Sequence, residues 1–361
     1  MRRPYTGASL YPAPHIPDKQ AMTTLPIHSA LPELLAALRR YSRAVLQAPP
    51  GAGKTTVVPL SMLEADLTGG RILMLEPRRL AARAAAERMA QTLGEPVGQT
   101  VGYRIRGEAK VSKSTRIEVV TEGILTRMIQ SDAELSGIGA VIFDEFHERS
   151  LNADLGLALC LEIADALRDD LILLAMSATL DADPVAALMG DVPVITSQGR
   201  AFPVDISWLD RPLPPKTRLE EATASLIQQA IAEPEGGVLV FLPGEGEIRR
   251  TEALLKGRLP ADCDIRPLFG AMEFGKQRAA IEPAKTGRKV VLATSIAETS
   301  LTIQDVRVVV DAGRSRRARL DPGSGMARLV TEKVTQAAAT QRPGRAEPGA
   351  DRRCFRPSTQ G

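Results

Sequence analysis

The sequence predicts an α/β protein with two similar domains in tandem, each built on a parallel sheet. First, a chain of 361 residues is too long for one core of ordinary size and suits two domains of roughly 150 to 180 residues. Second, short apolar segments alternate with helix-like segments, the pattern of parallel strands covered by helices. Third, this series occurs twice, with a proline-rich interval between the two occurrences.

The first series begins with a helix over 31–40, where apolar residues recur at helical spacing. The next apolar stretch, "AVLQAPPGAGKTT" (44–56), passes from strand-like residues into a glycine loop. Alternation then continues, with helices expected over 78–93 and 122–130 and strands over 71–77, 116–121, 139–145 and 170–179.

Residues 195–218 are rich in proline and poor in periodicity, and we interpret them as a linker. In the second series helices are expected over 219–232 and 245–257, and strands over 237–243, 288–294 and 306–313. We therefore assign residues 1–22 to a disordered N-terminal extension, 23–200 to the first domain and 201–361 to the second. Met22 is an alternative start, which would make the preceding residues a mis-assigned extension.

Composition and charge limit the function classes. The net charge of +3 is mild, and the arginine-rich runs at 313–320 and 351–356 suit phosphate contacts or, equally, solvated loops. Cys160, Cys263 and Cys354 are widely spaced without a zinc pattern, as in a reducing cytoplasm. No apolar run approaches the roughly 18 residues of a membrane span, and the start has no secretory signal. We expect a cytoplasmic protein without membrane association.

The segment "GAGKTT" (51–56) is a candidate phosphate-binding loop because a strand precedes it and a helix follows. Gly51 and Gly53 would let backbone N–H groups wrap phosphates, and Lys54 would reach the β and γ oxygens. Thr55 would offer its hydroxyl to Mg²⁺, with Thr56 next to it in the nucleotide site. The first glycine position of the motif holds an alanine, within "APPGAGKT". The alternative is a chance match in a glycine turn.

In "VIFDEFHERS" (141–150) an apolar strand runs directly into a cluster of ionisable residues. Unpaired buried charges are costly, so such a cluster belongs at the mouth of a strand. A phosphate loop needs an acid on a neighbouring strand to hold Mg²⁺; Asp144 fits this role, and Glu145 could polarise the attacking water. The alternative is a pair of solvated acids in a turn, and a single histidine such as His147 is often structural.

The segment "DEFHER" resembles the D-E-x-H box of superfamily 2 helicases, and ordered blocks around it resemble the DEAH/RHA family, in particular the bacterial HrpB type. These blocks are "EPRRLAARAAAERMA" (motif Ia), "VVTEGIL" (Ib), "SAT" (III), "VLVFLPGEGEIRR" (IV), "LATSIAETSLTI" (V) and "QRPGRA" (VI). The resemblance covers about residues 23–361. It implies two RecA-like P-loop domains and an ATP-dependent RNA helicase that hydrolyses ATP to translocate on and unwind nucleic acid.

The resemblance also implies roles for individual residues. Arg345 would be an arginine finger on the γ-phosphate, Arg88 would contact adenine, and Ser177 would couple the site to the domain interface. Mg²⁺ would be held by Thr55, Asp144 and Glu145. The residues expected to act in catalysis are Glu145, His147, Gln341 and Arg345. The residues expected to grip one nucleic-acid strand, RNA rather than DNA, are Arg78, Arg79, Thr121, Thr294 and Thr299.

The segment 306–331, with "DPGSG" at its tip, resembles the family's duplex-parting hairpin, although an ordinary edge hairpin of the second sheet is an equal alternative. We expect a monomer. A motor that remodels proteins is a further alternative, against which "TEGIL" and "SAT" argue.

Departures from the family pattern open a second hypothesis. Motif VI should continue with Gly-Arg, but "QRPGRA" is followed by "EPG", so a second arginine finger falls on Pro348 or was removed by a three-residue deletion. Ser295 replaces an asparagine, and Ile281 stands where an aromatic residue would stack on adenine. The chain also ends just after motif VI, which indicates a truncated core. The alternative function is therefore a catalytically impaired, nucleic-acid-binding helicase fragment.

Overall fold

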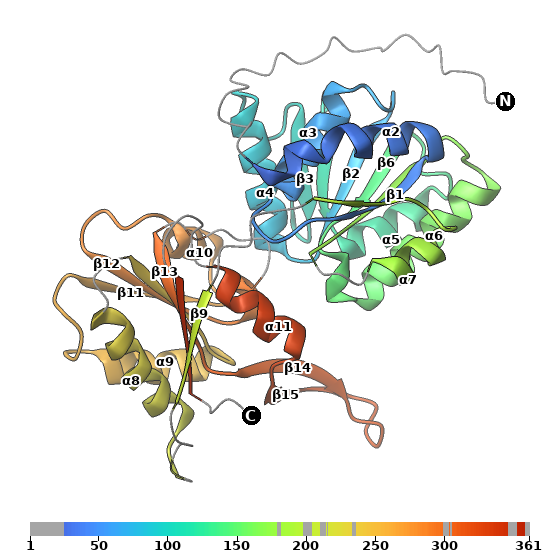
Figure 1. The fold of residues 1–361 in the computed structure, drawn as a ribbon. Helices are drawn as coiled ribbons and strands as arrows, with labels where there is room; N and C mark the ends of the chain where they lie inside the picture. Colours follow the sequence, from blue (N-terminus) through green and yellow to red (C-terminus); the bar gives the residue numbers. More distant parts are fainter. Residues whose placement is uncertain are drawn as a thin grey trace. The chain divides into compact units, whose positions relative to one another are not determined.

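The computed structural model describes residues 25–178, 182–197, 204–209, 214, 216–232, 236–298, 303, 305–345 and 352–357. The chain divides into two compact units, residues 1–201 (unit 1) and 202–361 (unit 2), each with its own sheet (Figure 1). The N-terminal extension expected over 1–22 lies outside the described residues. Among the described residues, no helix has both the length and the apolar character needed to cross a membrane.

Unit 1 is built on an eight-stranded sheet in the order β4-β3-β5-β2-β6-β7-β1-β8. Its strands are β1 (Arg43–Gln47), β2 (Arg71–Glu76), β3 (Val101–Ile105), β4 (Glu108–Lys110), β5 (Ile117–Thr121), β6 (Ile138–Phe143), β7 (Ile172–Ser177) and β8 (Val194–Thr196). Its helices are η1 (Pro26–Ser29), α2 (Leu31–Tyr41), α3 (Lys54–Glu64), α4 (Arg79–Thr92), α5 (Glu122–Ser131), η2 (Phe146–Glu148), α6 (Leu151–Ala166) and α7 (Asp183–Leu188). The described strand pairs are parallel, except that β4 runs antiparallel to β3 at the edge.

Helices cover both faces of this sheet, which explains why its strands are apolar at nearly every position. Successive residues of β2 belong to opposite cores: Met74 packs with residues of α2, α3 and α4, whereas Leu73 and Leu75 pack with residues of α5, α6 and α7. The continuous apolar runs read from the sequence are therefore buried parallel strands, as predicted.

Unit 2 has a six-stranded sheet in the order β11-β12-β10-β13-β16-β9, and its described pairs are all parallel. The strands are β9 (Val204–Trp208), β10 (Gly237–Phe241), β11 (Cys263–Leu268), β12 (Arg288–Ala293), β13 (Val306–Asp311) and β16 (Arg352–Arg356). The helices are α8 (Leu219–Ala232), α9 (Glu245–Leu255), α10 (Phe274–Ile281), η3 (Ser295–Ala297), α11 (Gln336–Gln341) and η4 (Arg342–Arg345). The predicted helices and strands of the second series all occur here.

The linker expected over 195–218 is wrong in part. Strand β8 ends at Thr196, and β9 lies inside the interval and pairs with β16, from Val204 beside Arg352 to Trp208 beside Arg356. This edge strand is five residues long and only partly buried. Its partner follows more than a hundred residues later in the chain, so no local periodicity marks it.

The hairpin is present, but it is not an edge of the second sheet. Residues from Val306 to Asp311 form β13 inside the six-stranded sheet. The strands β14 (Arg314–Leu320) and β15 (Ala327–Lys333) then pair antiparallel as a separate two-stranded sheet. Most side chains of these strands are exposed, including Leu320 and Leu329, and Met326 in the connection between the strands is exposed as well.

Candidate functional site

The glycine loop after β1 adopts a backbone that requires glycine. Gly51 and Gly53 have φ values of 79° and 94°, in the left-handed region that side chains disfavour. At Gly53 a Cβ atom would also lie 2.8 Å from Leu25 Cδ1. Helix α3 begins at the next residue, Lys54, so the free N–H groups of its first turn adjoin the loop. This is the arrangement that binds anions at helix N-termini.

Two residues of the loop contact two acids that follow β6. Lys54 Nζ lies 2.9 Å from Glu145 Oε1 and 4.0 Å from Asp144 Oδ1. Thr55 donates its hydroxyl to Asp144 Oδ2 at 2.6 Å. Lys54, Asp144 and Glu145 are each at most 5% exposed, so the contact between Lys54 and Glu145 is a buried charge-assisted hydrogen bond. The structure brings together the predicted phosphate loop and the predicted acidic cluster.

The topology of the sheet produces this meeting. Because β1 and β6 are parallel members of one sheet, the loops after their carboxyl ends lie at the same edge. The expectation that Asp144 follows a strand next to the phosphate-loop strand is wrong, since β7 lies between β1 and β6. β7 joins the site through its own end, where Ala48 donates its N–H to the Ser177 carbonyl at 3.0 Å.

A third acid, Glu76, belongs to the site and was not predicted. It is the last residue of β2, is fully buried, and lies beside the Asp144 carboxyl group. Burial raises its pKa well above the ordinary value, and the charges of Asp144 and Glu145 raise it further. Burial likewise raises the pKa of Asp144, against the opposing effect of Lys54. The available signal was an acid ending an apolar strand, the same signal that identified Asp144.

The residues Asp144 and Glu145, which follow β6, form what we call the acidic turn. His147 connects this turn to the end of β7. Its Nδ1 accepts the Ala178 N–H at 3.2 Å, and its Nε2 lies 3.4 Å from Glu145 Oε2. Burial lowers the pKa of His147, although Glu145 opposes this, which favours a neutral ring with the proton on Nε2 facing Glu145. Glu145 itself has φ 51°, a strained value of the kind found at functional sites. Thr179 lies outside the described residues.

The pair Thr55 and Asp144 fits a Mg²⁺ site of the kind that uses few protein ligands. Mg²⁺ demands octahedral oxygen ligation and usually keeps several waters, with one or two carboxylates and the substrate phosphates completing the shell. The hydroxyl and carboxylate oxygens are 2.6 Å apart at the loop. Among the residues that the structure describes, no group of three or more His, Cys, Asp or Glu side chains is arranged to hold a metal ion.

Three of the predicted nucleic-acid contacts lie at the ends of adjacent strands in unit 1. Arg78 and Arg79 follow β2, and Thr121 ends the neighbouring strand β5. Arg79 is exposed, whereas Arg78 pairs with Glu148 at 3.2 Å. Their common edge is also the edge of the phosphate loop, because all these strands are parallel.

The remaining predicted residues are more scattered. Thr294 directly follows β12 in unit 2, while Thr299 lies outside the described residues. Arg88 is exposed on α4 and donates to Gln91 Oε1 at 3.2 Å. Gln341 ends α11, and Arg345 is the last residue of η4. The altered end of motif VI, 346–351, lies outside the described residues as well.

Comparison with known proteins gives matches over most of the chain. The family model for the DEAD/DEAH box helicase matches residues 28–188, and that for the helicase conserved C-terminal domain matches residues 221–347. The "ATP-dependent RNA helicase HrpB" of Escherichia coli (strain K12) is 53% identical over 91% of this chain and 41% of its own length. An "ATP-dependent RNA helicase HrpA homolog" of Haemophilus influenzae is 34% identical over 92% of this chain and 26% of its own length.

Solved structures agree with these matches. The Escherichia coli DEAH/RHA helicase HrpB has a TM-score of 0.85 and 51% identity over 92% of this chain and 42% of the solved chain. A second crystal structure, of the E. coli DExH-box NTPase HrpB, has a TM-score of 0.79 at the same identity. The chain thus spans about two fifths of the length of the HrpB proteins that it matches. With both helicase domains matched and the phosphate loop joined to the acidic turn, the chain belongs to the DEAD/DEAH-box helicase family.

Proposed function

We propose that this chain is the motor core of an ATP-dependent RNA helicase of the HrpB type. The observation that carries the proposal is the double contact between the glycine loop and the acidic turn, Lys54 with Glu145 and Thr55 with Asp144. Lysine and threonine at these places are the partners of nucleotide phosphates and Mg²⁺ in phosphate-loop enzymes. The family match and the names of the relatives support ATP and RNA as the ligands.

In this proposal the nucleotide replaces contacts that the side chains now make with each other. Lys54 leaves Glu145 for the β and γ phosphates, which frees the Glu145 carboxylate to orient and polarise the attacking water. Thr55 and Asp144 would hold Mg²⁺, which would supply positive charge beside the phosphates. His147, anchored by the Ala178 N–H, keeps the Glu145 side chain oriented.

The proposal extends to the second domain and to the nucleic acid. Gln341 and Arg345 would act on the γ-phosphate of the same nucleotide, so that hydrolysis could alter the relation of the two domains and move the protein along a strand. The strand would be gripped through its sugar-phosphate backbone by Arg78, Arg79 and Thr121, with Thr294 and Thr299 in the second domain. Adenine contact by Arg88, a monomeric state and a cytoplasmic location belong to the same proposal.

A steady-state ATPase assay with and without single-stranded RNA or DNA of equal length tests the function. We expect Mg²⁺-dependent turnover that RNA stimulates more than DNA does. Glu145→Gln should retain nucleotide binding and lose turnover by a factor of at least about 100, since it removes the group that polarises water. Turnover by Glu145→Gln equal to that of the wild type would contradict the site assignment. An equal thermal midpoint for both proteins controls for folding.

The altered motif VI favours a second candidate, a helicase fragment that binds ATP and nucleic acid but hydrolyses ATP poorly. In "QRPGRAEPG" only Arg345 stands at a finger position of the family pattern. Loss of an arginine finger can cost a factor of about 10³ to 10⁵ in rate. Nucleotide and RNA binding without turnover would favour this candidate over an active motor.

A further inference from the structure

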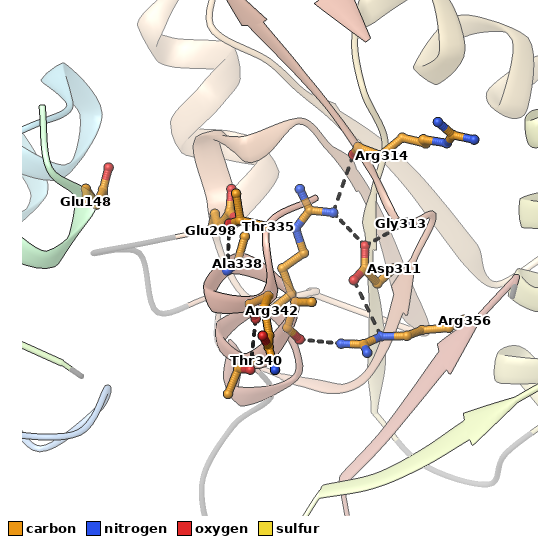
Figure 2. Close-up of polar contacts among 12 residues, drawn as sticks. Glu148, Glu298, Asp311, Gly313, Arg314, Thr335, Ala338, Thr340, Arg342 and Arg356 are labelled. Atoms are coloured by element: carbon orange, nitrogen blue, oxygen red, sulfur yellow. Dashed lines mark hydrogen bonds and ion pairs between the residues drawn. The ribbon is translucent and has the colours of Figure 1, made fainter. Parts of the chain in front are cut away.

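Arg342, the arginine that follows Gln341 in motif VI, is directed into the interior of unit 2. Its side chain is 1% exposed, and its guanidinium group lies 4.9 Å from the centre of the Phe241 ring. Nη1 is 2.5 Å from Asp311 Oδ1 and 3.5 Å from the carbonyl oxygen of Arg314. Nε lies 3.4 Å from Glu298 Oε1. The contacts of Arg342 therefore point toward the strand end and the hairpin start, as Figure 2 shows.

Asp311 contacts a second arginine in addition to Arg342, so the three side chains form a cluster. It is fully buried at the end of β13, and its Oδ1 also accepts the Gly313 N–H at 2.9 Å. Its Oδ2 lies 3.6 Å from Arg356 Nε, at the end of β16. Arg356 in turn donates to the carbonyl of Ala339 in α11 and lies over the Trp208 ring, 4.8 Å from its centre. We call Arg342, Asp311 and Arg356 the arginine clasp.

The clasp contacts the first end of the β14–β15 hairpin directly, and the second end is joined to it through Gly313. Gly313 and Arg314, which contact the clasp, begin the hairpin. At its other end Val334 donates its N–H to the Gly313 carbonyl at 3.1 Å. The next residue, Thr335, caps α11 by accepting the Ala338 N–H at 3.3 Å. The hairpin therefore leaves from, and returns to, the place where motif VI is fastened.

Burial of such a cluster is not explained by stability alone. Replacing buried ion pairs with apolar residues of similar size is often neutral or stabilising, whereas a fixed network of charge-assisted bonds imposes one arrangement. Here Nη1 of Arg342 contacts both Asp311 Oδ1 and the Arg314 carbonyl, which links the start of the hairpin to η4, the turn that contains Arg345.

We propose that Arg342 is a positioning residue that fastens the motif VI turn to the base of the β14–β15 hairpin through Asp311, so that a displacement of the turn is transmitted to the hairpin. This inference rests on the proposed function for its purpose, namely nucleotide-driven movement of a duplex-facing hairpin. The fastening itself is a property of unit 2 and can be tested without nucleotide.

Hydrogen exchange on the full chain without nucleotide gives the first test. Arg342→Lys keeps the charge but removes the planar fork, so amides at 313–317 and 331–335 should exchange about tenfold faster. Amides of β10 and β12 should keep their protection. Asp311→Asn, which keeps an oxygen acceptor for the Gly313 N–H, should show the same pattern more weakly. Because this experiment contains no ATP, its result can be interpreted even if the protein does not hydrolyse ATP.

Arg249→Lys is the matched control. Arg249 also lies over a phenylalanine, 5.6 Å from the Phe269 ring centre, and pairs with Glu245 at 3.4 Å, but it is on α9 with a side chain 59% exposed. Its substitution should leave hairpin exchange unchanged. Faster exchange confined to 336–345 in Arg342→Lys, with the hairpin unchanged, would overturn the proposal. Equal acceleration in β10, β12 and the hairpin would overturn it too, because the clasp would then only hold unit 2 together.

Trp208, the single tryptophan of the chain, provides a spectroscopic signature of the clasp. Replacing the guanidinium group of Arg342 in Arg342→Lys should shift Arg356 relative to the Trp208 ring and change the fluorescence emission of Trp208. Arg249→Lys should leave this emission unchanged. Identical emission spectra for the wild type and Arg342→Lys would contradict a connected clasp. In an active preparation Arg342→Lys should keep KM for ATP and unwind less RNA per ATP hydrolysed. A fall in turnover with unchanged unwinding per ATP would refute the transmission.

Discussion

Lys54 is predicted to stabilise unit 1 as well as to bind phosphate, because it is the cation among three buried acids. Its Nζ lies 2.9 Å from Glu145 Oε1 and 4.0 Å from Asp144, with Glu76 beside Asp144. At that shorter distance the gross attraction is about 6 kcal/mol for an effective dielectric constant of about 20. Much of this attraction is cancelled by the free-energy cost of removing both charged groups from water. Removing only the cation leaves the desolvation cost uncompensated.

The expected loss in the free energy of unfolding follows from the two ways in which the protein can respond to Lys54→Met. Leaving a buried charge unpaired costs about 3 to 5 kcal/mol. Protonating a carboxyl group of ordinary pKa at pH 7 costs about 4 kcal/mol, and only about 1 kcal/mol at pH 5. We therefore expect the free energy of unfolding of Lys54→Met to fall by about 3 to 4 kcal/mol at pH 7 and by about 1 kcal/mol at pH 5.

Urea unfolding followed by circular dichroism, without nucleotide, measures this free energy for the wild type, Lys54→Met, Glu145→Gln and the double variant. The double variant should be more stable than the sum of the single changes implies, because the neutral amide that replaces the Glu145 carboxylate no longer needs a cation. A loss below about 0.5 kcal/mol for Lys54→Met at pH 7, or additive effects, would show that the ion pair does not stabilise unit 1.

Three further predictions concern pH, motif VI and the hairpin. The raised pKa of Glu76 means that the folded chain retains a proton that the unfolded chain releases above about pH 4.5, so wild-type stability should fall as pH rises from there, by at most about 1.4 kcal/mol per pH unit. Glu76→Gln should remove this slope in urea titrations between pH 5 and 8, and parallel curves would contradict the assignment. Inserting Gly-Arg-Leu between Ala346 and Glu347 should raise RNA-stimulated ATP turnover at least about tenfold if a finger was deleted; unchanged turnover argues against a deletion. Leu329→Ser, at a side chain 71% exposed, should preserve stability within about 0.5 kcal/mol and reduce duplex unwinding without reducing ATP turnover. Unwinding at the wild-type rate would exclude a role for this side chain in parting the duplex.

Much of the site was predictable because its signals are local. The phosphate loop can be recognised by its glycines between a strand and a helix, and Gly51 and Gly53 have positive φ values. Asp144 and Glu145 are conspicuous because charges directly follow an apolar strand. Since carboxyl ends of parallel strands share an edge, a correct prediction of two parallel strands already implied that these groups meet.

The sequence by itself therefore determined the alternation of strands and helices, the two-domain α/β class and the residue types at the phosphate loop and acidic turn. Only the tertiary structure decided that β7 separates β1 from β6, that β9 pairs with β16, and that Glu76 joins Asp144. It alone showed that Arg342 of motif VI points inward to Asp311. The physical reason is that periodicity reports which face of an element is apolar. Strand order and the direction of a buried charge depend on partners distant in the chain, through pairing and desolvation energies that no local pattern contains.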